Sequence, residues 1–315
     1  MKRKSILKAL LVIVLFFGIG LLLDKGAVKV QAYYWEYISD LKQSGIAKNS
    51  VTVSWTAVKD AAKYRVEFKE YSAQSSVAYR VAGTTTATSY KIGGLKSGRK
   101  YYVRVTPISA SGEDGGEDDI YGAVTAPDKI AKFKQHSWWY YIKEFRVSWD
   151  ELDGVSGYQI EIYDGKNKKV KSANLTDYAT YYSHEKKVSN SQIYKVKLRA
   201  FTTFNGKKHY SKWQETLCFP QPEVKSVKVS SGKLNLKWGK LKGMTGFDIY
   251  VSTKRDSGYK KVKSVGKNAT STTISKFNKK SFNSKKTYYV YVVSKKKVGK
   301  TTYNSGSTFE WNSRY

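Results

Sequence analysis

One short pattern occurs three times along this chain and limits what the chain can fold into. Residues 51–55 (VTVSW), 145–149 (FRVSW) and 234–238 (LNLKW) alternate apolar with polar side chains and end in Trp. Alternation with period 2 is typical of a β-strand that has one face buried and the other face in water. The three Trp residues are 94 and 89 residues apart. Repetition at this distance predicts a tandem array of similar β domains.

Two further alternating runs follow each of these strands, the first of them at a constant distance. The first run begins nine residues after the Trp, at Tyr64, Tyr158 and Phe247. Turn residues separate the runs, which favours antiparallel sandwiches over alternating strands and helices. The second run begins with a Tyr, and an apolar residue stands six positions before each one: Leu95 before Tyr101, Val188 before Tyr194, and Phe282 before Tyr288. We expect six aromatic side chains to anchor the three cores: Trp55, Tyr101, Trp149, Tyr194, Trp238 and Tyr288.

The order and spacing of these runs resemble fibronectin type III domains. The segment Leu95-x-x-Gly98-x-x-Tyr101 is similar to the tyrosine corner of that family, in which the Tyr hydroxyl bonds back to the chain near the start of strand F. The other two copies keep the spacing but lack the Gly and have Val188 or Phe282 in place of Leu. The resemblance covers essentially all of the chain after residue 32. It implies an all-β protein of three tandem fibronectin type III-like (immunoglobulin-like) β-sandwiches, which serve generally as spacers and interaction modules.

The first 32 residues have the pattern of a secretory signal peptide. Four cations, Lys2, Arg3, Lys4 and Lys8, precede an apolar run at 9–23, and residues 30–32 (VQA) offer a small-x-small cleavage site. The alternative is an uncleaved membrane anchor, although 15 helical residues reach only about 22 Å of the ~30 Å hydrocarbon core. Both interpretations predict that the domains lie outside the cell, either secreted or associated with the envelope. Membrane contact is then expected only through this segment.

The repeat also predicts the domain boundaries. We expect domains at residues 33–127, 128–220 and 221–315, joined by short Pro-bearing linkers at 125–128 and 219–223. Such linkers favour semi-rigid spacing. The single cysteine, Cys218, cannot form an intramolecular disulfide, and its neighbours predict a buried apolar residue. An exported chain without disulfides favours a bacterial source.

Positive charge rises along the chain and is concentrated in the third domain. The three domains have net charges of +2, +7 and +18, and the last contains 22 Lys and Arg against four Asp and Glu. One explanation is composition and solubility alone. The other is attraction to an anionic cell-wall polymer or acidic polysaccharide, because a strong field raises the local concentration of anions. The candidate polyanion-binding residues are Lys260, Lys261, Lys263, Lys295, Lys296 and Lys297, and by family topology we expect positive charge at both ends of the domain.

Two aromatic clusters support a different hypothesis. Residues 33–37 (YYWEY) and 138–141 (WWYY) place rings at adjacent positions, which face opposite ways on a strand. Exposed rings could stack on sugars, as in a carbohydrate-binding accessory protein. The alternative is that they pack at a domain junction or over a core. A purely structural spacer is the third hypothesis.

No motif indicates catalysis, a cofactor or a metal. His136, His184 and His209 form no ligand pair, and neither a P-loop nor a nucleophile motif is present. The acidic segment 113–119 (EDGGEDD) could suggest a calcium loop, but its spacing does not match an EF-hand, and a solvated hairpin is favoured. Nucleic acid is a minor alternative, limited to extracellular DNA.

Overall fold

The structure is a computed structural model that describes residues 20–24, 27–31, 37–71, 76–139, 142–185, 187–306 and 311–312. Every regular element in these residues is a β-strand. Strands β1 (Gly20–Asp24) and β2 (Ala27–Gln31) form an antiparallel pair inside the predicted signal segment. The rest of that segment lies outside the described residues, so the signal peptide stays a prediction. None of the described elements is a helix of the length and apolarity needed to cross a membrane.

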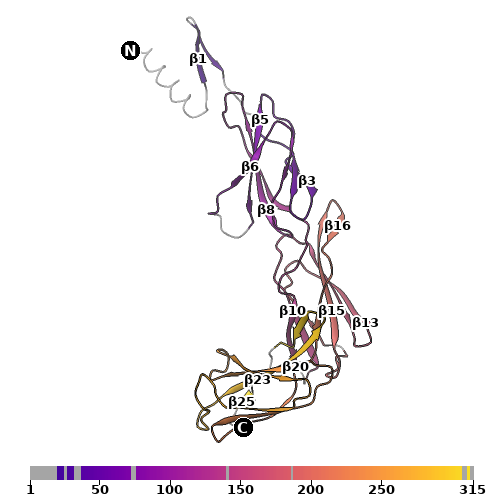
Figure 1. The fold of residues 1–315 in the computed structure, drawn as a ribbon. Coiled ribbons are helices and arrows are strands. Elements are labelled where there is room, and N and C mark those ends of the chain that lie inside the picture. Colours follow the sequence, from indigo (N-terminus) through magenta and orange to yellow (C-terminus); the bar gives the residue numbers. More distant parts are fainter. Residues whose placement is uncertain are drawn as a thin grey trace. The chain divides into compact units, whose positions relative to one another are not determined.

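The first domain is a sandwich of two antiparallel sheets (Figure 1). Their strand orders are β3-β4-β7 and β6-β5-β8-β9. Val53 from the first sheet and Val66 and Val103 from the second share one buried cluster, as their alternation predicts. The strands are β3 (Lys42–Ile46), β4 (Val51–Ser54), β5 (Lys63–Glu70), β6 (Arg80–Thr85), β7 (Ser89–Ile92), β8 (Lys100–Ile108) and β9 (Asp118–Val124).

The second domain repeats this topology. The small sheet has the order β10-β11-β14, and the large sheet has the order β13-β12-β15-β16, with β17 also paired to β15. The last strand of the fold is therefore divided into two pieces. The strands are β10 (Lys134–Trp139), β11 (Glu144–Ser148), β12 (Gly157–Tyr163), β13 (Lys169–Leu175), β14 (Tyr181–His184), β15 (Tyr194–Phe204), β16 (Lys207–Tyr210) and β17 (Gln214–Cys218).

The third domain has the same arrangement once more. Its sheets have the orders β18-β19-β22 and β21-β20-β23-β24, with β25 paired to β23. The strands are β18 (Val224–Ser230), β19 (Lys233–Trp238), β20 (Gly246–Ser252), β21 (Lys260–Gly266), β22 (Ser271–Ile274), β23 (Tyr289–Val298), β24 (Thr301–Asn304) and β25 (Trp311–Asn312). Three sandwiches of one topology confirm the predicted all-β tandem fold. The second and third sandwiches fall within one compact unit.

The nine-residue spacing corresponds to a ring contact that joins the two sheets of each sandwich. Each Trp follows or ends a strand of the small sheet, and its partner ring begins a strand of the large sheet. The ring centroids are 5.2, 5.4 and 5.8 Å apart in the three domains. Tilted and edge contacts at this distance are favourable for aromatic pairs. The pairs are Trp55–Tyr64, Trp149–Tyr158 and Trp238–Phe247, and all six side chains are buried.

Tyrosine hydroxyls also hold the loops beside these cores. Tyr194 accepts a hydrogen bond from the Ser189 backbone at 2.9 Å and donates to the Lys187 carbonyl at 3.3 Å. Tyr288 accepts from the Asn283 backbone at 3.1 Å. The tyrosine corner therefore forms in the second and third domains without the Gly of the first. Spacing, rather than the turn residue, preserves it there.

Replacing Tyr194 by Phe tests what the corner contributes. The variant leaves the Ser189 N–H without its acceptor, so we expect the free energy of unfolding of the second domain to fall by about 1–3 kcal/mol. Peptide-resolved hydrogen exchange in urea measures this domain separately from the others. Tyr178→Phe is the control, because the Tyr178 side chain is 73% exposed. Equal protection in both variants would contradict the assignment.

Candidate functional site

The six lysines predicted to bind a polyanion lie on two strands of the third domain. Lys260, Lys261 and Lys263 belong to β21, the edge strand of the large sheet. Lys295–297 belong to β23, in the strand part of the β23–β24 hairpin. The structure brings only one pair of them to a common partner: Lys261 and Lys295 both approach Asp248.

Asp248 neutralises the centre of this surface. It lies on β20 between the two lysine-bearing strands and is only 7% exposed. Lys295 donates to its carboxylate at 2.6 Å, and Ser264 donates at 2.5 Å. Burial alone would raise the pKa of Asp248, but these hydrogen bonds and the charge of Lys261 hold it below its ordinary value. Asp248 therefore offsets one of the two positive charges of Lys261 and Lys295, with the closer contact made by Lys295.

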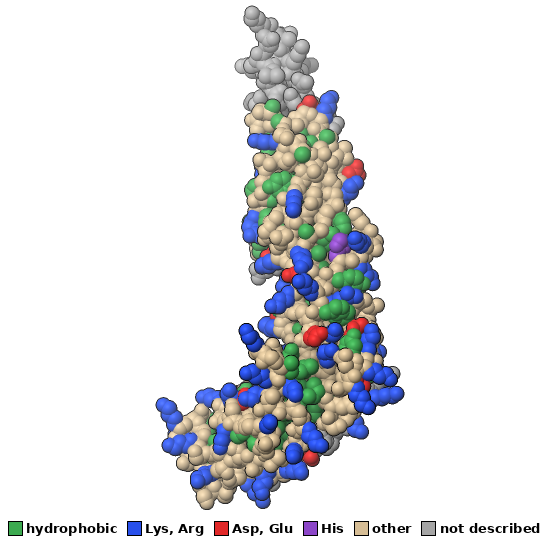
Figure 2. Space-filling view, turned by 45° about the vertical axis from the view of Figure 1, so that its right-hand side comes forward, with side chains coloured by type: hydrophobic (Ala, Val, Ile, Leu, Met, Phe, Trp, Pro, Cys, Tyr) green, Lys and Arg blue, Asp and Glu red, His purple; other side chains and the backbone are tan. Residues whose placement is uncertain are grey.

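Three of the other four lysines point to separate acceptors. The Nζ of Lys260 donates to the Asn278 side chain, that of Lys263 to the Thr273 carbonyl, and that of Lys296 to the Gly243 carbonyl. Lys297 is exposed. Because none of these acceptors is charged, the four cations keep their charge uncompensated at these contacts. In the lower part of Figure 2, which shows the third domain, Lys and Arg side chains are scattered across the visible face with few acids among them.

The second domain divides the predicted aromatic cluster between its two faces. Trp138 is buried in the core and donates to the Asn190 side chain at 2.9 Å. Trp139 faces outward, where the guanidinium of Arg146 lies between it and Tyr181, 5.0 and 4.7 Å from the two ring centroids. In the first cluster Tyr37 is 74% exposed. Residues 140–141 and 32–36 lie outside the described residues, so the placement of the other rings stays a prediction.

The acidic segment of the first domain is engaged by arginine. Arg65 donates to both oxygens of Asp114, at 2.9 and 2.5 Å. Arg104 donates to both oxygens of Asp119 at 3.0 Å and pairs with Glu117 at 2.9 Å. Within the described residues, no cluster of three His, Cys, Asp or Glu side chains could hold a metal ion. These carboxylates hold the β8–β9 hairpin against its own sheet.

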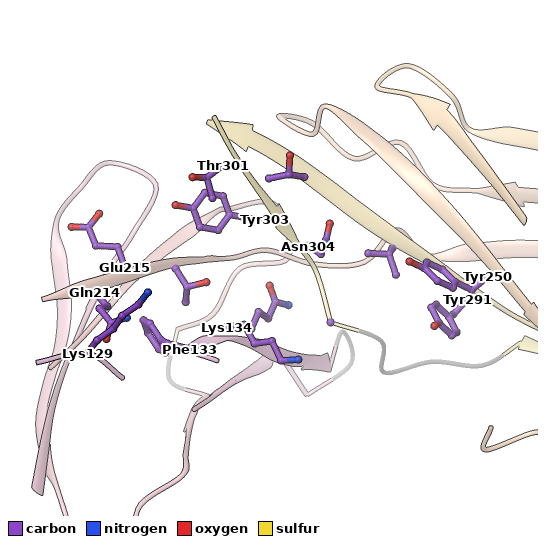
Figure 3. Close-up of a pocket in the computed structure, with 15 residues that line it drawn as sticks. Lys129, Phe133, Lys134, Gln214, Glu215, Tyr250, Tyr291, Thr301, Tyr303 and Asn304 are labelled. Atoms are coloured by element: carbon purple, nitrogen blue, oxygen red, sulfur yellow. The ribbon is translucent and has the colours of Figure 1, made fainter. Parts of the chain in front are cut away.

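A groove of about 940 Å³ opens within the unit formed by the second and third domains (Figure 3). Figure 3 shows β24 on one side of it and the start of the second domain on the opposite side. Tyr250 and Tyr291 lie together at one end, with ring centroids 4.8 Å apart and planes 16° apart. The labelled lining residues are Lys129, Phe133, Lys134, Gln214, Glu215, Tyr250, Tyr291, Thr301, Tyr303 and Asn304.

Two glutamine side chains build the floor of the groove. The amide of Gln135 donates to the Phe219 carbonyl and accepts from the Phe219 N–H, both at 3.0 Å. The amide of Gln214 makes the same double contact with Ile130, at 2.9 and 2.6 Å. Each amide thus pairs with the backbone as a neighbouring strand would. Their polar atoms are satisfied by the protein itself.

Residues 219–222, between the second and third domains, are buried rather than exposed. Phe219, inside the predicted linker, is 0% exposed and belongs to the core cluster of the third domain. The buried Ser294 donates to the Pro220 carbonyl at 3.0 Å, and the Gln221 side chain donates to the Gly306 carbonyl. A core side chain and paired polar groups therefore fix this junction.

The comparison with known proteins assigns the first of these domains. The sequence profile described as the fibronectin type III domain matches residues 36–120. The first domain is a fibronectin type III domain. Because the second and third domains repeat its two sheets and strand order, the chain is a tandem array of fibronectin type III-like sandwiches.

Two solved structures are similar to this array. The FN1–FN3 domains of chicken CNTN1 share 16% identity, with 88% of this chain and 97% of that chain covered and a TM-score of 0.37. A two-domain fibronectin type III segment from chicken tenascin shares 15% identity, with 59% and 100% covered and a TM-score of 0.33. A comparison with curated protein sequences gives no match.

Sequence reasoning missed Tyr250, Tyr291 and the groove beside them. Both residues stand at outward positions of strands whose inward positions were correctly assigned to the core. Aromatic side chains at outward positions were the available signal. The groove itself needed the fold, because its walls come from separate segments of the sequence: residues 129–135, 214–216, 250, 291–293 and 301–306.

His184 is a buried titratable group that none of these sites uses. It is 5% exposed, packs against Phe145 and Tyr194, and its Nε2 atom has no hydrogen-bond partner among the described residues. Burial, together with the charge of Lys171, lowers the pKa of His184 from its ordinary value of 6.5.

This lowered pKa makes the stability of the second domain depend on pH. Below about pH 6.5 the unfolded chain binds a proton that the native His184 excludes, so stability is full at neutral pH and falls as the pH decreases. Hydrogen exchange in urea at pH 7.5 and pH 5.0 should show this loss. His184→Phe should remove part of it, whereas an unchanged pH dependence in that variant would refute the explanation.

Proposed function

We propose that this protein is an exported, non-enzymatic binding module that adheres to anionic envelope polymers or acidic polysaccharide through its third domain. Fibronectin type III domains generally serve as adhesion or spacer modules, which gives the coarse class. The observation that carries the finer proposal is the charge of the third domain, 22 cations against four acids. One of those acids, Asp248, is buried between two lysines and offers little repulsion to an approaching anion.

The distribution of the lysines supports broad adhesion rather than one pocket. Lys260 and Lys263 lie on β21, while Lys279, Lys280, Lys285 and Lys286 lie on the segment between β22 and β23. Lysine is a hydrated point charge, whereas arginine presents a planar fork that suits a shaped phosphate or carboxylate site. Twenty of the 22 cations are Lys. A flexible polyanion can contact many such charges at once without any fixed geometry.

A second candidate function is carbohydrate binding by an exposed aromatic surface. The outward-facing Trp139, Arg146 and Tyr181 form a stack on the small sheet of the second domain. The Arg146 Nε also donates to Ser183 at 2.9 Å, so this stack is held in place by its own sheet. Ring contacts of this kind persist at high salt, whereas charge adhesion is screened.

A salt series on the full chain tests the adhesion proposal. Binding to intact bacterial walls should fall steeply as salt rises towards about 1 M, where the Debye length is only about 3 Å. Walls stripped of anionic polymer should not retain the protein. Binding that is equal on stripped walls and in high salt would refute the proposal.

Matched charge variants show whether adhesion is spread over the domain. Replacing Lys279, Lys280, Lys285 and Lys286 by Gln should weaken binding and flatten its salt dependence, because fewer counterions are released. Replacing Lys260, Lys263 and Lys297 by Gln should weaken it in proportion to the charge removed. The control removes four exposed lysines of the first domain: Lys42, Lys59, Lys63 and Lys91. An equal loss in the control would indicate a net-charge effect without a role for the third domain.

A further inference from the structure

We propose that the groove between β10, β17 and the large sheet of the third domain binds a segment of an acidic glycan chain. This site is separate from the dispersed lysines and differs from them in kind, because it is concave and lined by rings and hydroxyl groups. Its volume of about 940 Å³ lies at the upper end of the range of ligand sites, ~300–1,000 Å³.

The side chains that line the groove match the chemistry of sugars. Half-buried rings stand at one end of the groove, where Tyr250 and Tyr291 are stacked on one another. Tyr259, which is not part of the lining, packs against Tyr291 at 4.7 Å. Their apolar surfaces suit the C–H faces of sugar rings. On β24, Thr301, Thr302 and Asn304 add exposed hydroxyl and amide groups along one wall. Rings and hydrogen-bonding groups thus line the same space, as a glycan requires.

The charges of the groove favour an acidic ligand over a neutral one. Lys129 and Lys134 are exposed on the wall opposite β24 (Figure 3). The one carboxylate in the lining, Glu215, is paired with Lys197 at 3.1 Å. Ammonium groups therefore outnumber acids on the lining, and the acid is already compensated. A carboxylate or other acidic substituent of a glycan would pair with these ammonium groups.

The lining disfavours an extended peptide. Peptides that add to a sheet edge depend on pockets for alternate side chains. Val293 is the one aliphatic side chain on this lining, and the glutamine amides of the floor are already used by the backbone. The groove therefore offers stacking surfaces and hydroxyl groups, but few places for apolar side chains.

The junction holds the two walls in register before a ligand arrives. Phe219 is buried in the third core, and the backbone at 219–220 is bonded to Gln135 on one side and Ser294 on the other. A site that is already formed loses less entropy on binding. A Cβ at Gly306 would overlap the His136 carbonyl, so Gly306→Ala should displace one wall without removing any side chain of the lining.

Calorimetric titration of the full chain tests the site with two oligosaccharide probes. One alternates uronic acid with N-acetylhexosamine, and the other is a neutral N-acetylhexosamine oligomer of equal length. We expect the acidic probe to bind and Tyr250→Ala to weaken it by roughly tenfold. Tyr250→Phe should keep most of the affinity, because it keeps the ring. Lys134→Gln should reduce the preference for the acidic probe, and Gly306→Ala should weaken both probes.

The controls separate this site from the adhesion surface and from misfolding. Tyr178→Ala and Lys171→Gln remove an exposed ring and an exposed cation of the second domain elsewhere, and should leave binding unchanged. The variant in which Lys279, Lys280, Lys285 and Lys286 are replaced by Gln should adhere more weakly to walls but keep its affinity for the oligosaccharide. No saturable binding of either probe, equal loss in Tyr250→Ala and Tyr178→Ala, or displacement only by polyglutamate would overturn the proposal.

Discussion

The ring contact between the strand-ending Trp and the aromatic residue nine positions later is the interaction on which each sandwich depends. It joins the two sheets near the point where the chain passes from one to the other, with ring centroids 5.2–5.8 Å apart in the three domains. In the first two domains the partner ring is Tyr, and its hydroxyl also accepts from the loop backbone, at Val58 and Leu152. Phe247 makes the ring contact alone. The contact is thus the common element, and the hydroxyl bond is an addition to it.

The inner faces of the sheets form this core. The outer faces of the large sheets do not, so their side chains can differ from one domain to the next. In the first domain, arginines and acidic residues cover that face and neutralise one another. In the third, Asp248 sits among lysines, with the stacked Tyr250 and Tyr291 beside it. The same backbone therefore presents a balanced surface in one domain and a basic, aromatic surface in another. Function in such an array lies in outward positions, which the core does not constrain.

This division also explains what the sequence could predict. Alternation and spacing identified the inward residues, because burial imposes a strict period on a strand. They located Trp55, Tyr194 and Tyr288 in their cores without any structure. Outward residues obey no such period, so the lysines of β21 and β23 could be chosen by their charge but not assigned to partners. The contact of Lys261 and Lys295 with one aspartate depends on strand pairing across β20, which spacing does not encode.

The contacts at the junction of the second and third domains also could not be predicted from the sequence pattern. A Pro-bearing segment predicts a spacer, and nothing in its composition indicates that Phe219 enters the next core. Because that side chain is buried, a fragment that begins at residue 221 would lack part of its own core. The linker is then a structural element that shapes the groove beside it, rather than a tether between independent beads. Charge adhesion needs no such order, since a polyanion can adapt to scattered lysines. A glycan that stacks on rings does need a fixed junction. The two modes of binding therefore differ in whether they require this unit to be rigid.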